Sequence, residues 1–261
     1  MLAAFGLSGP PVRLPGGSGG SWRTGDAVLK PVDAGEAELV WRTELFESLS
    51  GDGFRVARPV RALDGSVAVA GWTAARFVEG RHEPRWRDVI AVGELFHAAL
   101  AGLSRPGFLD ARTDPWSIGD RVAWGDLSVQ SFGQVKHLER LAASLEPIGE
   151  PSQLVHGDLG GNVLFATGLP PAIIDFSPYW RPAGFASAIV VGDALTWEGA
   201  DDSILDAVRH VPAFGQLLLR ALIYRIVTDS ILFPDAGPRE DGADPYLPVV
   251  ELAVRLARKG P

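Results

Sequence analysis

Residues 156–162 read His-Gly-Asp-Leu-Gly-Gly-Asn, and residues 173–176 read Ile-Ile-Asp-Phe. A short apolar run leads into each group, at residues 154–155 and 172–174, which predicts two short strands that end in polar side chains. The side chains at these strand ends, close together in the sequence, are Asp158, Asn162 and Asp175.

These three oxygen-bearing side chains suit the transfer of a phosphoryl group. That chemistry needs one carboxylate that orients the attacking hydroxyl, and further oxygen ligands that hold Mg²⁺ against the phosphates. Asp and Asn also serve as loop caps and turn formers. Three of them at this spacing favour the catalytic interpretation.

The composition limits the class of protein. A chain of 261 residues with 46% hydrophobic content can bury a sizeable core as one large domain or two lobes. No run of about 18 apolar residues is present, and residues 1–15 lack the pattern of a secretory signal, so we expect a cytoplasmic protein without a membrane partner. The absence of cysteine excludes disulfides and thiolate metal sites. A net charge of −8 argues against a nucleic-acid partner.

The first third of the chain predicts a sheet and one helix. A glycine-rich turn at residues 16–21 precedes an expected strand at 22–30, which indicates a hairpin. Apolar residues recur with helical spacing over 34–49. Two further strands, 54–63 and 66–78, flank an Asp-Gly turn. Lys30 is the sole lysine in the first half of the chain.

After Gly80 the pattern becomes helical. We expect helices over residues 86–103, 135–145, 215–233 and 247–258. The histidines of this region show no metal-ligand spacing and are interpreted as ordinary helix or loop residues: His82, His97, His137 and His210. Large aromatic side chains more often fill cores than line pockets, and this is the interpretation preferred for Trp72, Trp116, Trp180 and Trp197.

The motifs at 156–162 and 174–175 resemble those of the aminoglycoside phosphotransferase and choline kinase superfamily, relatives of the protein kinases. The glycine-rich turn, Lys30 and the order of the lobes agree with this resemblance, which covers nearly the whole chain. It implies an α+β, protein-kinase-like fold. Residues 1–80 would form a small nucleotide-binding lobe with an antiparallel sheet and one helix. Residues 81–261 would form a larger, mainly helical lobe for catalysis and acceptor binding.

The resemblance also implies roles for the motif residues. Asp158 would be the catalytic carboxylate that orients the acceptor hydroxyl or accepts its proton, and His156 would brace the catalytic loop. Asn162 and Asp175 would bind Mg²⁺, and Asp193 would brace the lobe by hydrogen bonding. The family usually has four residues between the aspartate and the asparagine, whereas this chain has three. Two of these three are glycines, which reach backbone conformations closed to other residues.

The nucleotide would be held by the first lobe. The glycine-rich turn would cover the phosphates with backbone N–H groups, and Lys30 would pair with the α- and β-phosphates. Glu44 is the preferred helix carboxylate to steady Lys30, with Glu36, Glu38 and Glu47 as neighbouring alternatives. The remaining expected contacts are the turn residues Ser18, Gly19, Gly20 and Ser21, and the adenine-binding backbone of Arg76, Phe77 and Val78.

The sequence thus predicts a small-molecule kinase that moves the γ-phosphoryl group of ATP or GTP to a hydroxyl of an amino sugar, aminoglycoside or amino alcohol. An acidic cluster at residues 198–206 would attract a cationic acceptor, but its interpretation as an ordinary solvent-exposed surface is preferred. The shortened loop favours one alternative, a nucleotide-binding pseudokinase. A protein kinase is less favoured because residues 176–192 are a short segment. We expect a monomer or weak homodimer; the acceptor, the nucleotide base, the activity of the shortened loop and any role in antibiotic resistance are left open.

Overall fold

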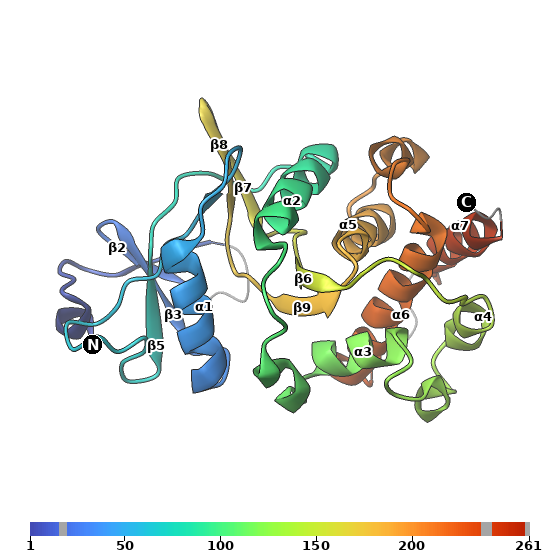
Figure 1. Ribbon diagram of the computed structural model, residues 1–261, viewed down its shortest axis with the longest axis horizontal. Coiled ribbons are helices and arrows are strands. Elements are labelled where there is room, and N and C mark those ends of the chain that lie inside the picture. The colour runs from blue at the N-terminus through green and yellow to red at the C-terminus, as the bar shows by residue number, and fades with distance from the viewer. Residues whose placement is uncertain (16–19, 236–241, 259–261) are drawn as a thin grey trace. The chain divides into compact units, whose positions relative to one another are not determined.

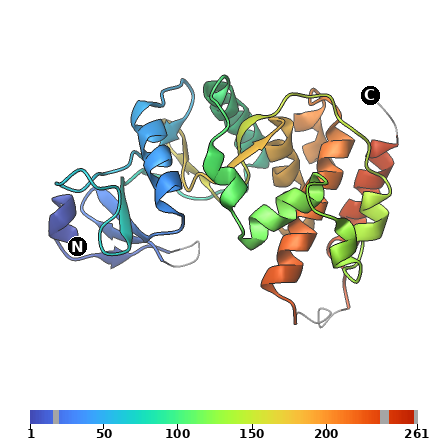
Figure 2. The ribbon, with the colours of Figure 1, turned by 60° about the horizontal axis from the view of Figure 1, so that its bottom comes forward.

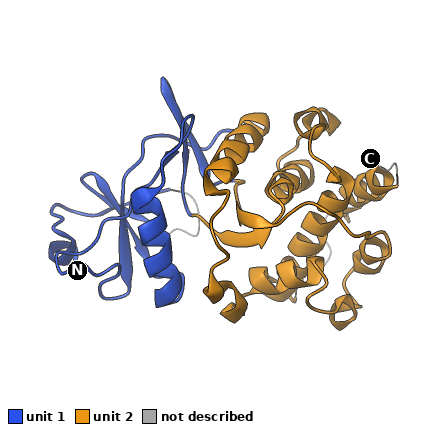
Figure 3. Cartoon of the chain, viewed as in Figure 1, with its two compact units in different colours: residues 1–83, 161–175 blue, residues 84–160, 176–261 orange. Residues whose placement is uncertain are grey.

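The computed structural model describes residues 1–15, 20–235 and 242–258 and divides the chain into two compact units (Figure 3). The first unit comprises Met1–Glu83 and Gly161–Asp175, and the second comprises Pro84–Gly160 and Phe176–Pro261. The expected boundary at residue 80 therefore lies close to an observed one, but residues 161–175 do not belong with the helical part of the chain. They belong to the first unit because their strands pair with a strand of that unit.

The first unit contains a four-stranded antiparallel sheet in the order β1-β2-β3-β5 (Figure 1). The expected hairpin is present, because β1 and β2 pair on either side of the glycine-rich segment. The single strand expected over 22–30 is instead two strands, since Gly25 turns the chain with a φ of 57°. The strands are β1 (Val12–Arg13), β2 (Trp22–Thr24), β3 (Ala27–Pro31) and β5 (Trp72–Arg76).

Alternation along β3 decides which way Lys30 points. Ala27 and Leu29 are buried, whereas Val28 and Lys30 are only partly so. Leu29 packs into a core with Phe5 and other apolar residues of the unit. Because successive strand residues point to opposite faces, Lys30 lies on the face away from this core.

A second, three-stranded sheet completes the first unit in the order β4-β8-β7. Its strands are β4 (Arg55–Val56), β7 (Val163–Ala166) and β8 (Leu169–Ile173), with β4 parallel to β8. The Arg55 side chain strengthens this junction by donating to the Pro170 carbonyl at 2.8 Å. The one α-helix described in this unit, α1 (Glu36–Ser48), confirms the helix expected over 34–49; a 3₁₀ turn, η1 (Leu2–Phe5), precedes it in the chain.

The second unit is mainly helical and is organised around α6 (Figure 2). Its α-helices are α2 (Trp86–Leu100), α3 (Pro115–Ala123), α4 (Leu138–Ala142), α5 (Gly184–Trp197), α6 (Phe214–Leu232) and α7 (Leu247–Ala257). Its strands, β6 (Gln153–His156) and β9 (Pro178–Arg181), form an antiparallel pair, and short 3₁₀ turns are η2 (Gly107–Ala111), η3 (Val129–Phe132) and η4 (Asp202–Val208).

The centre of this unit is closely packed. Helix α6 is buried on nearly all sides and packs against α3, α5 and α7. A Cβ at Gly119 of α3 would lie 2.6 Å from the Tyr224 carbonyl of α6, so glycine is what lets the two backbones approach. No helix of the described ranges is both long and apolar enough to cross a membrane.

Four of the expected helices are confirmed, namely α1, α2, α6 and α7, within a few residues at their ends. The helix expected over 135–145 was too long, because His137 adopts a left-handed φ of 71° and α4 begins only after it. Helix α5 escaped prediction because it is apolar on all sides and so carries no amphipathic period. Helix α3 and strands β7 and β9 were also not predicted.

Candidate functional site

The expected site residues fall on both compact units. On the first unit, Lys30 and Asp175 form an ion pair between Nζ and Oδ1. Lys30 reaches this position from the face of β3 opposite the core, and Asp175 follows the end of β8. Their side chains are 32% and 42% exposed, so both remain accessible to a ligand.

Asn162 lies beside Asp175 because β7 and β8 pair with each other. Val163 stands opposite Ile173, and the Ile174 N–H donates to the Asn162 carbonyl at 3.0 Å. Gly161, one of the two glycines in the shortened loop, has a φ of 74° that other residues rarely adopt. The tighter turn therefore depends on that glycine just before Asn162.

Asp175 itself has a φ of 51°, in the left-handed region that only glycine visits routinely and that aspartate and asparagine adopt occasionally. Strained backbone of this kind clusters at functional sites, where the surrounding structure maintains it. Here the β7–β8 pairing fixes the chain up to Ile174 and the ion pair with Lys30 fixes the side chain.

The donor atoms offered by Asn162 and Asp175 are oxygens, which suit Mg²⁺. Within residues 1–15, 20–235 and 242–258, no group of three or more His, Cys, Asp or Glu side chains converges as a metal cage. Mg²⁺ is commonly held by one or two carboxylates together with the phosphates of a substrate. The residues present therefore fit a magnesium ion that arrives with a nucleotide.

On the second unit, two buried histidines hold the backbone of the loop that carries Asp158. His97 of α2 accepts a hydrogen bond from the His156 N–H at 3.0 Å, through Nε2. His156 in turn accepts from the Asp158 N–H at 3.1 Å, through Nδ1. The ring of Phe176 packs edge-on against His156 at 5.5 Å. Burial lowers the pKa of His97 to about 3, and His156 adds to the effect, so the ring is neutral.

The side chain of Asp158 is held from a different direction, by Arg225 of α6. Arg225 Nη2 donates to Asp158 Oδ1 at 2.8 Å and to Asp193 Oδ2 at 2.5 Å. Arg225 Nε also donates to Asp193 Oδ1 at 2.9 Å. Burial alone would lower the pKa of Arg225, but the charge of Asp193 outweighs it and the pKa is raised. The guanidinium is therefore always cationic.

A cavity of about 550 Å³ lies one helical turn beyond Arg225. It is lined by Asp229, four residues after Arg225 on α6, and by Trp197, four residues after Asp193 on α5. Residues four apart share a helix face, and α5 packs against α6. The cavity thus continues along the same surfaces that carry Arg225 and Asp193.

The two carboxylates of this cavity differ in their partners. Asp244 Oδ2 lies 2.6 Å from Lys136 Nζ, with which it forms an ion pair, and 2.7 Å from His137 Nε2. Asp229 accepts a hydrogen bond from the Tyr246 hydroxyl at 2.5 Å, and among the described residues no cation pairs with it. Trp197 packs edge-on against Tyr246 at 5.2 Å. The cavity therefore combines aromatic surface with one carboxylate whose charge is uncompensated.

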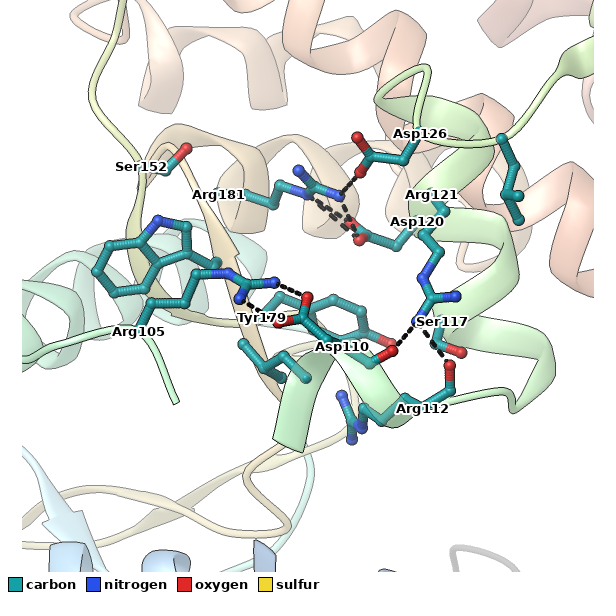
Figure 4. A pocket seen from close by; sticks show the side chains of 13 residues that line it. Arg105, Asp110, Arg112, Ser117, Asp120, Arg121, Asp126, Ser152, Tyr179 and Arg181 are labelled. Carbon is teal, nitrogen blue, oxygen red and sulfur yellow. Dashed lines mark hydrogen bonds and ion pairs between the residues drawn. The ribbon is translucent and has the colours of Figure 1, made fainter. Parts of the chain in front are cut away.

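A second cavity, of about 410 Å³, is lined by four arginines and three aspartates that lie in or next to η2, α3 and β9 (Figure 4). These charges largely satisfy one another. Arg105 binds both oxygens of Asp110, and Arg181 binds Asp120 at 2.7 Å and Asp126 at 2.9 Å. Burial raises the pKa of Asp120, and the charge of Arg181 opposes that rise. Arg181 thus ties β9 to α3 by ion pairs, and Arg121 ties α3 to η2 by donating to the Asp110 carbonyl at 3.0 Å.

The structure bears on the choice among the candidate helix carboxylates of the nucleotide-binding lobe. Glu44 is exposed and forms no ion pair with Lys30, whereas Glu38 is buried at 4% exposure. Six residues separate the two, which rotates Glu44 by roughly 240° around the helix axis. Ser18 and Gly19 lie outside the described residues. The other two turn residues were expected to cover the phosphates with their N–H groups. The Ser21 carbonyl accepts a hydrogen bond from the Leu14 N–H, which leaves that expectation for Gly20 and Ser21 unchanged.

Two amides expected to face adenine are already engaged. The Arg76 N–H donates to the Arg58 carbonyl, and the Phe77 N–H donates to the Asp26 carbonyl. Of their backbone polar groups, these two residues can therefore offer a base only the carbonyl oxygens. The role expected of Val78 is not altered by these contacts.

Three residues that shape the site were missed by the sequence analysis: His97, Arg225 and Asp229. A usable signal existed for two of them, because Arg225 and Asp229 are two of only three charged residues in a largely buried helix. Charged groups are rarely buried unless they have partners. His97 gave no such signal, since its partner is a backbone N–H far along the chain.

Comparison with known proteins adds to this geometry. The family described as "Phosphotransferase enzyme family" matches residues 18–179, more than half of the chain. No curated protein matches the sequence. Among solved structures, a choline/ethanolamine kinase family protein from Mesorhizobium loti is similar with a TM-score of 0.59 and 16% identity, covering 98% of this chain and 94% of its own.

Two further solved structures have the same kinase-like fold. Spectinomycin phosphotransferase in complex with ADP and spectinomycin has a TM-score of 0.58 and 14% identity, covering 95% of this chain and 92% of its own. Choline kinase LicA from Streptococcus pneumoniae has a TM-score of 0.53 and 12% identity, and the match covers 97% of this chain and 95% of LicA. Identities this low show the fold alone.

The buried His97 predicts a loss of stability at mildly acidic pH. The unfolded chain binds a proton at His97 below pH 6.5, whereas the folded chain does not until about pH 3. Each pH unit within that window should therefore cost about 1.4 kcal/mol of unfolding free energy. Urea unfolding at pH 7, 6 and 5 measures the slope.

The variant His97→Gln isolates this contribution, because a glutamine carbonyl can accept the His156 N–H without titrating. Its stability should fall less between pH 7 and pH 5 than that of the wild type. His82→Gln, which removes an exposed histidine, should keep the wild-type slope. Equal slopes for all three proteins would show that His97 is not buried in its neutral form.

Proposed function

The chain belongs to the phosphotransferase enzyme family, and from that premise we propose that it is a small-molecule kinase that transfers the γ-phosphoryl group of ATP to a hydroxyl of an amine-bearing acceptor. The observation that carries this proposal is the grouping of Lys30, Asn162 and Asp175 on the first unit. One cation and two oxygen ligands are what a metal-bound polyphosphate requires.

In this proposal Lys30 binds the α- and β-phosphates as a point charge. Asn162 and Asp175 would hold Mg²⁺, which when bound neutralises phosphate charge and supplies the electrostatic stabilisation of phosphoryl transfer. The related spectinomycin phosphotransferase was solved with ADP, which favours ATP as the nucleotide; none of the comparisons supports GTP. Glu38 replaces Glu44 as the candidate helix carboxylate of the nucleotide half, because it is the buried one.

Asp158 serves the acceptor. Its carboxylate orients the acceptor hydroxyl and takes its proton as the hydroxyl oxygen bonds to the γ-phosphorus. The bond between that phosphorus and the β–γ bridging oxygen breaks, and ADP leaves with the bonding electrons. The backbone contact with His156 and the side-chain contact with Arg225 hold Asp158 for this task.

We infer that the acceptor carries an ammonium group and binds the cavity beside Asp229. A cation there would meet a carboxylate without a cationic partner and the aromatic side chains of Trp197 and Tyr246, and carboxylates and aromatic rings both attract ammonium ions. Burial, followed by the hydrogen bond to Asp229 and the charge of Asp229, raises the pKa of Tyr246, so its hydroxyl stays a donor that orients the Asp229 carboxylate.

Nucleotide binding should depend on Lys30 and Asp175. A ligand that binds only the folded state raises its melting temperature, so Mg·ATP should stabilise the wild type. Lys30→Ala should blunt that shift because the phosphates lose their cation. Asp175→Asn should blunt it only when Mg²⁺ is present, and asparagine tolerates the left-handed backbone at this position.

The control for these melting curves is Arg209→Ala, which removes an exposed cation that pairs with Asp206 on the second unit. Its Mg·ATP shift should equal that of the wild type. A full shift for Lys30→Ala would show that the phosphates bind elsewhere.

Transfer should depend on Asp158. A screen with Mg·ATP against aminoglycosides, amino sugars and amino alcohols, read by product mass, should yield a product heavier by one phosphoryl group. Asp158→Ala should lower turnover on the order of 10²- to 10⁴-fold, the usual loss for a positioned general base. Nucleotide affinity should change little. If the wild type binds ATP but phosphorylates none of the acceptors, the result would favour a pseudokinase instead.

Acceptor affinity should depend on Asp229. Asp229→Asn should raise KM for an amine-bearing acceptor roughly 10- to 100-fold, because the ammonium loses a charge-assisted partner. Asp244→Asn is the matched control, since that carboxylate lines the same cavity but already pairs with Lys136 and His137. The proposal for the cavity is wrong if both variants change KM equally, or if a deaminated acceptor is affected as strongly.

A further inference from the structure

We propose that Arg225 is a positioning residue that fixes the orientation of the Asp158 carboxylate by joining it to Asp193. This inference rests on the proposed function, because it assigns a role in the same phosphoryl transfer. Arg225 lies 67 residues away from Asp158 in the chain and in no motif of the sequence. It would act through Asp158 and would not touch the phosphates or the acceptor.

The first observation is how the guanidinium divides its hydrogen bonds. Asp193 accepts hydrogen bonds from Arg225 Nε at 2.9 Å and from Nη2 at 2.5 Å. This is the two-point contact that a planar guanidinium makes with a carboxylate. Nη2 carries two N–H groups, and it also donates to Asp158 at 2.8 Å. One nitrogen therefore joins the two carboxylates, and the two-point contact with Asp193 fixes the plane from which it reaches Asp158.

The second observation is the difference in rigidity between the elements involved. Asp193 and Arg225 lie within α5 and α6, two helices packed against each other in the core of the second unit. Asp158 lies on a loop that contains Gly157, Gly160 and Gly161. Glycine gives a loop more backbone freedom than other residues. The contact with Arg225 ties the side chain on this loop to the helices.

The third observation is the gradient of exposure. The side chains of Asp193 and Arg225 are 14% and 16% exposed, whereas that of Asp158 is 40% exposed. The buried pair thus supports a carboxylate that solvent and an acceptor can reach. His156 already fixes the Asp158 backbone N–H. Arg225 adds a second constraint at Oδ1. Because the carboxylate is rigid and planar, fixing the backbone and one oxygen also fixes the position of the other oxygen.

A merely structural role, in which Arg225 only neutralises the buried Asp193, makes a different prediction. In that case, removing both charges together would restore stability and turnover at once. In the positioning role, the double variant Asp193→Asn/Arg225→Gln should restore stability but not turnover, because the contact from the Arg225 guanidinium to Asp158 is still missing. The single variant Arg225→Gln should lose both, since it leaves Asp193 buried without its cation.

The experiment measures melting temperature, kcat and KM for ATP in these variants. We expect a kcat roughly 10- to 100-fold below wild type in the double variant, the scale of loss for a misplaced reacting group, with KM for ATP unchanged. In an Asp158→Ala background, the double variant should cause no further loss of kcat, because Arg225 acts through the missing side chain. Recovery of wild-type kcat together with the melting temperature, or a further loss in the Asp158→Ala background, would overturn the proposal.

Crystal structures of the wild type and of the double variant test the proposal without turnover. The Asp158 carboxylate should leave its wild-type rotamer, or become disordered, in the double variant. An unchanged, ordered carboxylate would overturn the positioning role. If the wild type fails to transfer phosphate to any acceptor, the proposed function fails, and these two structures still decide whether Arg225 orients Asp158.

Discussion

The contact between Arg225 and its two carboxylates is the interaction on which the second unit depends most. Asp193 and Arg225 come from neighbouring core helices, and charges at such depth persist only when they are paired and hydrogen-bonded. The pair therefore restricts how α5 and α6 can be aligned. The same alignment directs one guanidinium N–H toward Asp158 and places Asp229 and Trp197 one turn farther along the two helices. Core packing and the geometry of the candidate acceptor site thus share one constraint.

A different constraint governs the first unit. The strand pairing of β7 with β8 brings Asn162 next to the residue before Asp175, and the pairing of β8 with β4 places both within that unit. The alternation of side chains along β3 directs Lys30 to the face of the strand opposite the core. On that face its amine pairs with Asp175. Hydrogen-bonded backbone therefore positions all three groups, and only one residue, Asp175, adopts a strained φ to complete the arrangement.

The cavities of the second unit show why the pairing of charges matters more than their number. The cavity among η2, α3 and β9 has seven charged residues, yet its arginines bind its aspartates or backbone carbonyls. The cavity lined by Trp197, Asp229 and Asp244 has fewer charges, and Asp229 lacks a cation among the described residues. An incoming ammonium ion would replace no existing ion pair at Asp229. The acidic cluster at 198–206 resembles the first case, since Asp206 pairs with Arg209 and Asp201 caps η4.

The sequence by itself determined the features that depend on local pattern. The strand ends that carry Asp158 and Asp175, the lysine on a β-strand and four of the helices follow from periodicity and motif spacing over a few residues. Tertiary structure alone decided which distant groups meet. Glu38 and not Glu44 is buried, His97 accepts from the His156 backbone, and Arg225 reaches Asp158 from a helix 67 residues farther along the chain. Such contacts depend on how whole helices rotate and pack, and a local pattern carries no information about the side chain that a neighbouring helix will present.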